Sequence, residues 1–484
     1  MMSTAAERMM ARNRHGDGRR GRGFLTGIVL PFLLTLAPGL ALAPGLGAQD
    51  VEDRFPGVSL GLLFEGRTQP VIAIQPFEGG AVAQRAENIV ARNLRHSNRF
   101  RVLDSIPEAF TRGQETVDYA LWDQLGADWL VTGRLDGAGT LVLEVHDVIY
   151  RETRDSGRFP ILAPDHSDFR LSVHIASDAV VQWVFNEPGI AASRIVFSRR
   201  MDDGSQDLWM VDADGENLQR ITRDRPEEEG HPIAMSPAWS PDGRRVVYTS
   251  YRSGLPRIYE LNLETGERRS VPAPMAGDYI TPTYLPDGER IAFAVNAGRN
   301  SGLFTYNIVE QCCFEELSRG RWEDISPTFA PDGSQFAFNS NRLGVGAPQI
   351  YRRPVNGGSP AIVSPYLYER PGYYTSPDWS PVGDRLAYHG RIDRRGTHQI
   401  LVSEIGRRGR VVQLTQEGNN QDPSWAPDGR HLVFAAERNW GRALMIVDTE
   451  TGATRTLVSG IVARMPAWSP SLSVRPAADA EAPQ

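Results

Sequence analysis

The chain has 484 residues, a formal net charge of −7 and 52 basic residues, all of which are arginine. An acidic balance argues against a partner held by bulk charge, such as nucleic acid or an anionic membrane surface. The absence of lysine from the sequence excludes a Walker phosphate loop, a Schiff base and a Ser-Lys nucleophile. The length exceeds that of one ordinary hydrophobic core, so more than one domain is expected.

Residues 1–48 have the pattern of an export signal. An arginine-rich start precedes the apolar stretch FLTGIVLPFLLTLAPGLALA, and small residues follow it. A membrane anchor is the alternative interpretation, but Pro31, Pro38 and Pro44 interrupt the apolar stretch. We therefore expect a signal peptide that is cleaved near Ala48.

Residues 70–190 are predicted to form a small α/β domain, because strand and helix patterns alternate there. The predicted strands are 70–77, 100–104, 128–137 and 140–152, and the predicted helices are 83–98, 116–126 and 166–186. His174 and Asp178 stand one turn apart in the last helix and could bind a metal. A local pair of side chains is the favoured interpretation, since isolated pairs of this kind are seldom sites.

One phrase recurs six times between Ser236 and Leu472. Its copies are SPAWSPDG, TPTYLPDG, SPTFAPDG, SPDWSPVG, DPSWAPDG and MPAWSPSL, with their aromatic residues 43 to 50 positions apart. This is the period of a β-propeller blade. Each phrase is predicted to form an inner strand and its Pro-Asp-Gly turn, followed by three antiparallel strands. Six copies of the third strand indicate six blades, and the repeated residues themselves are predicted to be framework.

The last phrase lacks the Asp-Gly turn and the strand that should follow. Conversely, RIVFS around Phe197 has the pattern of a second strand with no inner strand before it. We expect the C-terminal MPAWS to complete the blade that begins at Ile195, which would close the ring and remove its open edges. The predicted fold is thus multidomain, with an N-terminal α/β domain and an all-β six-bladed β-propeller, residues 191–472, closed by a C-terminal inner strand. A disordered tail is expected at 473–484.

The two cysteines, Cys312 and Cys313, are adjacent. Neighbouring Cα atoms lie about 3.8 Å apart, whereas typical disulfides need more than about 4.4 Å. A strained disulfide and a free thiol pair both remain open.

Enzymes with propellers give the rival interpretation. A propeller-bearing serine peptidase needs a G-x-S-x-G nucleophile elbow on a hydrolase domain, and neither GRNSG nor GGSPA fits that pattern. A hydrolase or lyase with a metal or carboxylates in the central channel remains an alternative.

Four stretches together resemble the TolB family of the Tol-Pal system. They are VIAIQPF with NRFRVLD, HIASDAVV leading to RIVFSRR, MSPAWSPDGRRVVYTSYRSG, and the final MPAWSP. The resemblance implies a monomeric, non-enzymatic periplasmic adaptor without cofactor or metal, which reaches membranes only through its partners. It would bind the lipoprotein Pal through the propeller and TolA through the N-terminal region, and it could contact other envelope proteins. Its role would be outer membrane integrity and constriction during cell division.

The resemblance also places the partner-binding residues. The TolA-interacting segment would lie in residues 49–69, with Val51, Phe55, Val58, Leu60, Leu62 and Phe64; an edge strand on the N-terminal sheet is the alternative. Pal would dock where long loops enter the inner strands, because loops on a rigid scaffold carry binding. The candidates there are His231, Asp278, Tyr279, Thr281, Asp324, Ser326, Tyr373, Tyr374, Asn420, Gln421, Asp422 and Arg464. Tyr279, Tyr373 and Tyr374 are the expected aromatic anchors.

Overall fold

The computed structural model describes residues 58–59, 69–103, 116–223, 233–298, 300–318, 320–344, 347–366, 372–391, 396–406 and 410–474. Within these ranges no helix is both long and apolar enough to cross a membrane. The predicted signal peptide, the predicted tail beyond Val474 and most of the predicted TolA-interacting segment lie outside the described residues.

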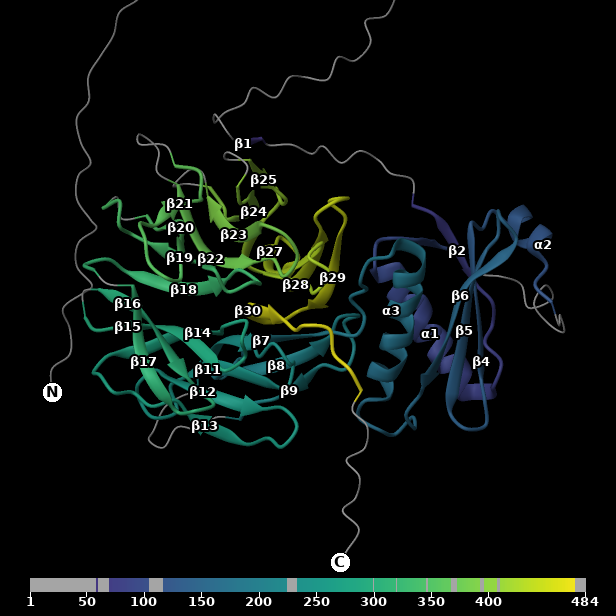
Figure 1. The fold of residues 1–484 in the computed structure, drawn as a ribbon, viewed down its shortest axis with the longest axis horizontal. Helices are drawn as coiled ribbons and strands as arrows, with labels where there is room; N and C mark the ends of the chain where they lie inside the picture. The colour runs from purple at the N-terminus through teal and green to yellow at the C-terminus, as the bar shows by residue number, and fades with distance from the viewer. Residues whose placement is uncertain are drawn as a thin grey trace, which may run out of the picture. The chain divides into compact units, whose positions relative to one another are not determined.

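Six antiparallel sheets form the propeller, and Figure 1 shows their inner strands near a common centre and their short outer strands at the periphery. Blade 1 contains β10 (Ala234–Trp239), β11 (Arg245–Ser250), β12 (Arg257–Asn262) and β13 (Arg268–Ser270). Blade 2 contains β14 (Asp278–Tyr284), β15 (Arg290–Asn296), β16 (Ser301–Asn307) and β17 (Cys312–Ser318). Blade 3 contains β18 (Asp324–Phe329), β19 (Gln335–Ser340), β20 (Gln349–Pro354) and β21 (Ala361–Ile362).

The remaining blades follow the same order from inner to outer strand. Blade 4 contains β22 (Tyr373–Trp379), β23 (Arg385–Arg391), β24 (Gln399–Glu404) and β25 (Val411–Gln413). Blade 5 contains β26 (Asn419–Trp425), β27 (His431–Arg438), β28 (Gly441–Asp448) and β29 (Thr454–Ser459). Blade 6 contains β30 (Val462–Trp468), β7 (Arg194–Arg200), β8 (Gln206–Asp212) and β9 (Gln219–Arg220).

Blade 6 closes the ring as predicted. Strand β30 pairs antiparallel with β7, with Trp468 opposite Ile195, and in Figure 1 the yellow C-terminal strand lies beside the teal one. The Trp468 indole Nε1 donates to Ser193 Oγ at 2.7 Å, and the Arg194 backbone N–H donates to Ser469 Oγ at 2.9 Å. The prediction of six blades sealed by a C-terminal inner strand is confirmed.

Every inner strand carries the same irregularity, which the sequence did not predict. The residue before the first proline of each phrase has φ between 50° and 56°, and the pairing register shifts there. The six residues are Ser236, Thr281, Ser326, Ser376, Asp422 and Met465. Positive φ is uncommon outside glycine, so its sixfold recurrence identifies a β-bulge built into the blade design.

Side chains of the inner strands also connect neighbouring blades. In three cases a polar side chain accepts the backbone N–H of the aromatic residue in the next blade. The pairs are Thr328 Oγ1 with Trp379 at 3.0 Å, Asp378 Oδ2 with Trp425 at 2.7 Å, and Ser424 Oγ with Trp468 at 3.1 Å.

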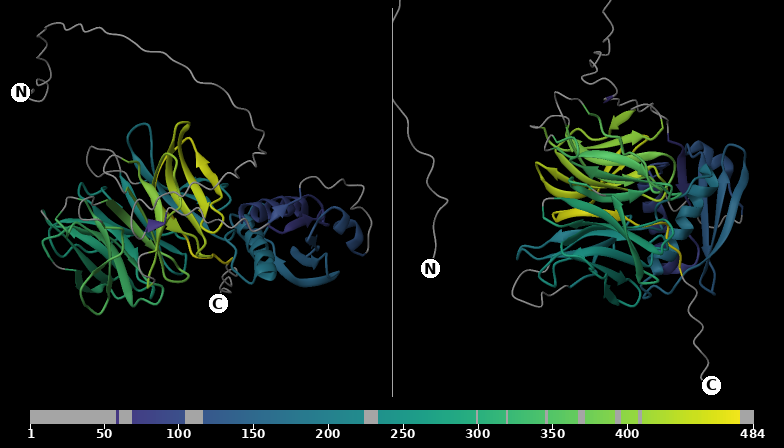
Figure 2. Two further views of the ribbon diagram at one scale, coloured as in Figure 1. Left: turned by 90° about the horizontal axis from the view of Figure 1, so that it is seen from above. Right: turned by 60° about the vertical axis from the view of Figure 1, so that its left-hand side comes forward.

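The α/β domain has one five-stranded sheet in the order β3-β2-β4-β5-β6. Its elements are β2 (Val71–Ile74), α1 (Gly80–His96), β3 (Arg101–Val102), α2 (Tyr119–Gln124), β4 (Trp129–Leu135), β5 (Thr140–Asp147), β6 (Glu152–Pro160) and α3 (Phe169–Phe185). Helices α1 and α3 lie against one face of the sheet (Figures 1 and 2), and their apolar residues form one core with it. Trp122 of α2 packs with Ala73 and Leu130 in a separate cluster.

Strand β1 (Val58–Ser59) is the described part of the predicted TolA-interacting segment. It pairs in parallel with Val411 and Val412 of β25, at the outer edge of blade 4. The alternative of an edge strand on the N-terminal sheet is therefore wrong for these two residues.

The sequence left open whether the two adjacent cysteines are bonded to each other. Cys312 and Cys313 form a disulfide at the start of β17.

Candidate functional site

The loop face is the end of the propeller at which the six inner strands begin. Strand β14 begins at Asp278, β18 at Asp324 and β22 at Tyr373, and the other inner strands begin at the same end. The predicted Pal-binding residues that the structure describes therefore share one end of the ring. His231 lies outside the described residues.

Two of the three expected aromatic anchors are core residues. Tyr279 and Tyr374 are each only 1% exposed. The Tyr279 ring packs 5.6 Å from that of Phe293, and its hydroxyl donates to the Met275 carbonyl at 3.0 Å. Tyr374 packs edge-on against Tyr388. The prediction that both tyrosines offer exposed anchors is wrong, because successive side chains of a strand point to opposite faces.

Three polar candidates are also buried and hold the framework together. Arg342 donates two hydrogen bonds to the Asp324 carboxylate, at 2.9 and 2.8 Å. Asn420 Nδ2 donates to Gln399 Oε1 at 2.8 Å. Asp422 is 5% exposed. These buried side chains support the loops of the loop face.

Other candidates meet on blades 4 and 5, together with residues that the sequence did not indicate. The Tyr373 ring lies 5.5 Å from the ring of His398, and the Arg391 guanidinium lies 5.3 Å from the Tyr373 ring. His398 Nδ1 is 3.1 Å from Asn419 Oδ1 and 3.5 Å from Gln421 Nε2. A tyrosine, a histidine and two amides thus form a continuous, partly exposed patch, which we call the Tyr373 patch.

Asp422 connects this patch to blade 6. Its Oδ2 accepts hydrogen bonds from Arg464 Nε at 2.7 Å and from the Met465 backbone N–H at 3.1 Å. Burial opposes ionisation of Asp422, but the charge of Arg464 and the hydrogen bonds from Arg464 and the Met465 backbone lower its pKa. The His389 Nδ1 accepts the Asp422 backbone N–H at 3.0 Å. Burial lowers the pKa of His389 to about 4, so this ring is neutral at pH 7.

The central channel begins beneath the loop face. It has a volume of about 550 Å³ and is lined by two prolines and one aromatic residue from each copy of the repeated phrase. Thr281 and Ser326 lie in its wall, where the Ser326 backbone N–H donates to Thr281 Oγ1 at 3.1 Å. Among its described lining residues the carboxylates are Asp378 and Asp422, and backbone N–H groups of neighbouring blades bond to both. These bonds give the two carboxylates a structural role.

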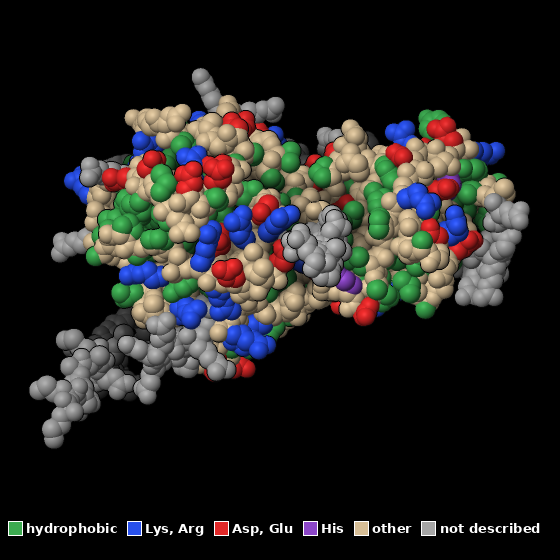
Figure 3. All heavy atoms as spheres, turned by 60° about the horizontal axis from the view of Figure 1, so that its bottom comes forward, with side chains coloured by type: hydrophobic (Ala, Val, Ile, Leu, Met, Phe, Trp, Pro, Cys, Tyr) green, Lys and Arg blue, Asp and Glu red, His purple; other side chains and the backbone are tan. Residues whose placement is uncertain are grey.

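The surface carries charges of both signs. Figure 3 shows arginine side chains interspersed with acidic ones on the side that it presents. On that side no large field of one sign is visible, so recognition there depends on local groups.

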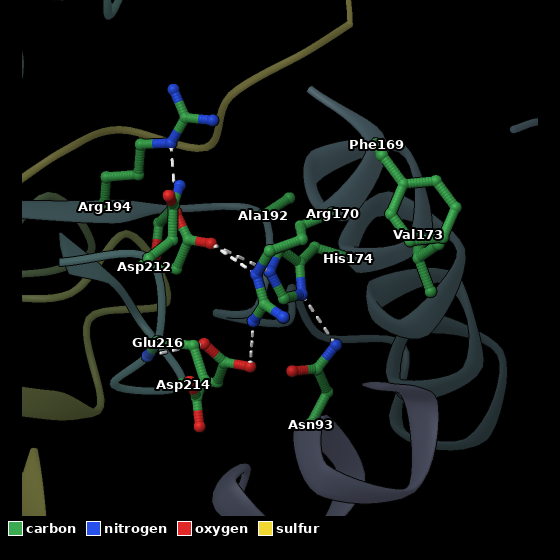
Figure 4. A network of polar contacts seen from close by, with 12 residues as sticks. Asn93, Phe169, Arg170, Val173, His174, Ala192, Arg194, Asp212, Asp214 and Glu216 are labelled. Atoms are coloured by element: carbon green, nitrogen blue, oxygen red, sulfur yellow. Dashed lines mark hydrogen bonds and ion pairs between the residues drawn. The ribbon is translucent and has the colours of Figure 1, made fainter. Parts of the chain in front are cut away.

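A buried polar network joins the α/β domain to blade 6 (Figure 4). Arg170 of α3 donates through Nε to Asp212 Oδ2 at 2.9 Å and through Nη2 to Asp214. Asn93 of α1 lies 2.9 Å from His174 Nδ1, and His174 Nε2 is 3.6 Å from Asp212 Oδ2. Side chains of α1 and α3 thus interact with one another and with the two aspartates at the end of β8. We call this network the junction.

His174 and Asp178 do not form the predicted local pair. Asp178 instead accepts the backbone N–H groups of Ala191 and Ala192, each at 2.8 Å, and so fixes the linker into the propeller. Burial raises the pKa of Asp178 to about 6, although the two backbone hydrogen bonds oppose that shift.

The described residues contain two groups with the composition of metal ligands. His174, Asp212 and Asp214 bring ligand atoms within 4.8 Å of one another, as do Glu310 and the two cysteines. In the first group Arg170 pairs with both carboxylates and Arg194 pairs with Asp212, and in the second the thiols are bonded to each other. We therefore assign a structural role to both groups.

Two family models match the chain. Residues 64–152 match the TolB amino-terminal domain, and residues 182–472 match the TolB β-propeller domain.

Individual relatives agree with the family models. The Tol-Pal system protein TolB of Anaeromyxobacter dehalogenans is 34% identical over 244 residues, which are 48% of this chain and 54% of the relative. The protein of the same name from Albidiferax ferrireducens is 34% identical over 49% of this chain and 53% of its own length. These matches thus span about half the length of each relative.

A solved structure matches more of the chain. The crystal structure of TolB from Acinetobacter baumannii superposes with a TM-score of 0.70, covering 84% of this chain and 97% of the other, at 24% identity. At this identity the match shows a shared fold of both domains.

Proposed function

Because the chain belongs to the TolB family, we propose that it is a non-enzymatic adaptor of a Tol-Pal system. It would work in the periplasm, where it would support outer membrane integrity and constriction during cell division. The observation that carries this proposal is the match of both TolB domains in one chain, together with relatives named as Tol-Pal system proteins.

Pal is the proposed partner of the loop face. The Tyr373 patch supports this choice, because it combines an aromatic ring with amide and imidazole groups that can bond to a partner backbone. Arg464 extends the same surface to blade 6. Tyr279, Tyr374 and Asn420 would contribute indirectly, by holding the loops in position.

TolA is the proposed partner of the N-terminal region. The relevant segment includes Val58, whose strand β1 pairs at the edge of blade 4, whereas Val51, Phe55, Leu60, Leu62 and Phe64 lie outside the described residues. A two-residue parallel pairing contributes few hydrogen bonds, so this segment could leave the blade to reach a partner.

Binding of Pal tests the proposal directly. The double variant Tyr373→Ala/Gln421→Ala should weaken capture of the soluble domain of Pal from the same organism at least tenfold, because interface aromatics carry a large share of binding energy. Titration calorimetry gives the dissociation constants, and thermal unfolding shows whether the variant keeps its fold.

The matched control is Tyr150→Ala, because Tyr150 is a 78% exposed aromatic residue of the α/β domain. It should bind Pal like the wild-type protein. Failure of the wild-type protein to bind Pal would refute the proposed function. Full binding by the folded double variant would refute only the placement of Pal on the Tyr373 patch, and the proposed function would stand.

A further inference from the structure

A second cavity, which we call the arginine pocket, opens on the loop face between blades 5 and 6. Its volume is about 290 Å³. Its wall is formed where β26 and β30 begin, where β7 and β27 end, and where β8 and β28 begin. The lining residues are Arg200, Gln206, Asn419, Gln421, Ala435, Ala436, Glu437, Arg442, Val462, Ala463 and Arg464.

The charged lining is predominantly basic. Arg200, Arg442 and Arg464 face a single acidic lining residue, Glu437, although the chain as a whole carries a net charge of −7. The three arginines come from β7, β28 and β30, so two blades must pack together before the guanidinium groups meet. A concentration of like charges costs stability unless a counter-charge balances it.

The structure satisfies these arginines only in part. Arg464 bonds to Asp422 through Nε, and Arg442 bonds to Glu437 Oε1 through Nε and Nη2 at 3.3 and 3.2 Å. The exposed guanidinium of Arg200 has no hydrogen bond or ion pair with any described residue. Since each guanidinium offers five N–H donors, the pocket retains donor capacity for an anion.

The other residues that line the arginine pocket indicate which kind of anion it would bind. Gln206, Asn419 and Gln421 add amide groups, while Ala435, Ala436 and Ala463 are buried and form an apolar wall. Planar guanidinium groups match the planar geometry of a carboxylate. Amides suit a neighbouring peptide group, and alanines suit the methylene groups of a side chain. Together they fit an Asp or Glu side chain presented by a folded protein.

We infer that the arginine pocket receives a carboxylate side chain of the protein that docks on the loop face. This inference rests on the proposed function, in which that protein is Pal. The pocket shares Gln421 with the Tyr373 patch, so one docked domain could fill the pocket and cover the patch together.

Charge variants test the inference in two opposite directions. The double variant Arg200→Gln/Arg442→Gln should raise the dissociation constant for the soluble domain of Pal about tenfold. It should also make that constant less dependent on salt, because fewer charge contacts remain to be screened. Glu437→Gln should lower the dissociation constant several-fold, because it removes the carboxylate that competes for Arg442. A merely structural role of the pocket would not produce opposite effects.

Titration calorimetry at low and physiological salt measures both effects, and unfolding curves confirm that the variants are folded. Arg321→Gln serves as the control, because Arg321 is an exposed arginine just before β18, in another sector of the same face. Wild-type binding of Pal with unchanged constants for all pocket variants would overturn the inference and leave the proposed function standing. Absence of any wild-type binding would overturn both.

Discussion

At the residue scale, Asp378 is a carboxylate whose buried environment disfavours its charged form. It lies in the inner strand of blade 4 and accepts the Trp425 backbone N–H from the next blade. Burial raises its pKa to about 6, although hydrogen bonds from Trp425, Ser424 and Thr328 oppose the shift. The equivalent positions in blades 3 and 5 are Thr328 and Ser424, neutral residues that make the same bond.

The substitution Asp378→Asn should therefore stabilise the protein at pH 8. A pKa raised from 3.8 to about 6 means that protonation stabilises the fold fully below pH 3.8, and that this stability is lost as pH rises through 6. The loss amounts to at most about 3 kcal/mol, and asparagine avoids it while keeping the acceptor oxygen. Urea unfolding at pH 8 and pH 4 should show a gain of about 1–3 kcal/mol that disappears at the lower pH.

The control for that experiment is Asp332→Asn in a turn, where the carboxylate is exposed. It should not reproduce the gain at pH 8. If the Asp378→Asn variant had a lower free energy of unfolding than the wild-type protein at pH 8, the charged carboxylate would stabilise the propeller and the prediction would be contradicted.

At the element scale, strand β30 determines whether the propeller is a closed ring. Trp468 belongs to the core cluster that blades 5 and 6 share, and its indole also bonds to Ser193 ahead of β7. Trp468→Ala should cost about 3–5 kcal/mol, as removal of a large buried aromatic residue does. Trp440→Ala, at a residue that is 56% exposed, should change stability by less than about 0.5 kcal/mol. The urea midpoints of the two variants compare these costs, and equal midpoints would contradict the assigned role of β30.

The elements that could be predicted from the sequence are those marked by a local pattern of residue types. Inner strands, their Pro-Asp-Gly turns and the complementary half-blades at the two ends of the array are all visible as repeated residue types. Strand β6, Glu152–Pro160, was missed because its residues are mostly exposed and its composition shows no apolar alternation. The positive φ at Ser236 and its equivalents was missed because a following proline ordinarily favours extended backbone.

The candidate site was harder to predict than the fold, because it depends on which way each side chain points. Tyr373 and Tyr374 are neighbours of one residue type, yet one joins the surface patch and the other fills the core. Gly390 leaves the space for the Tyr374 ring, since a Cβ there would lie 2.1 Å from that ring. The arginine pocket draws on β7 and β28, which are far apart in sequence, so no local pattern could reveal it.

At the scale of the whole molecule, the junction makes the α/β domain and blade 6 depend on each other. Asp212 and Asp214 are buried; Arg170 from α3 pairs with both, and Arg194 of β7 pairs with Asp212. Although burial alone would raise the pKa of Asp212, His174, Arg170 and Arg194 lower it to about 2. The charged form therefore stabilises the fold above pH 3.8, and that stability is lost as pH falls through 2. The α/β domain and blade 6 are thus held together by paired charges at neutral pH.

Arg170→Met should separate the unfolding of the two domains. Removing one partner of a buried ion pair leaves uncompensated charge and typically costs about 3–5 kcal/mol. We expect two calorimetric transitions in the variant where the wild-type protein gives one. Adding Asp212→Asn and Asp214→Asn to Arg170→Met should recover part of the loss, because the two carboxylates are then uncharged while Arg194 keeps its pair with Asp168. Arg158→Met, which breaks the exposed pair with Asp136, should leave a single transition. A single, unshifted transition in Arg170→Met would show that the coupling of the domains does not depend on Arg170.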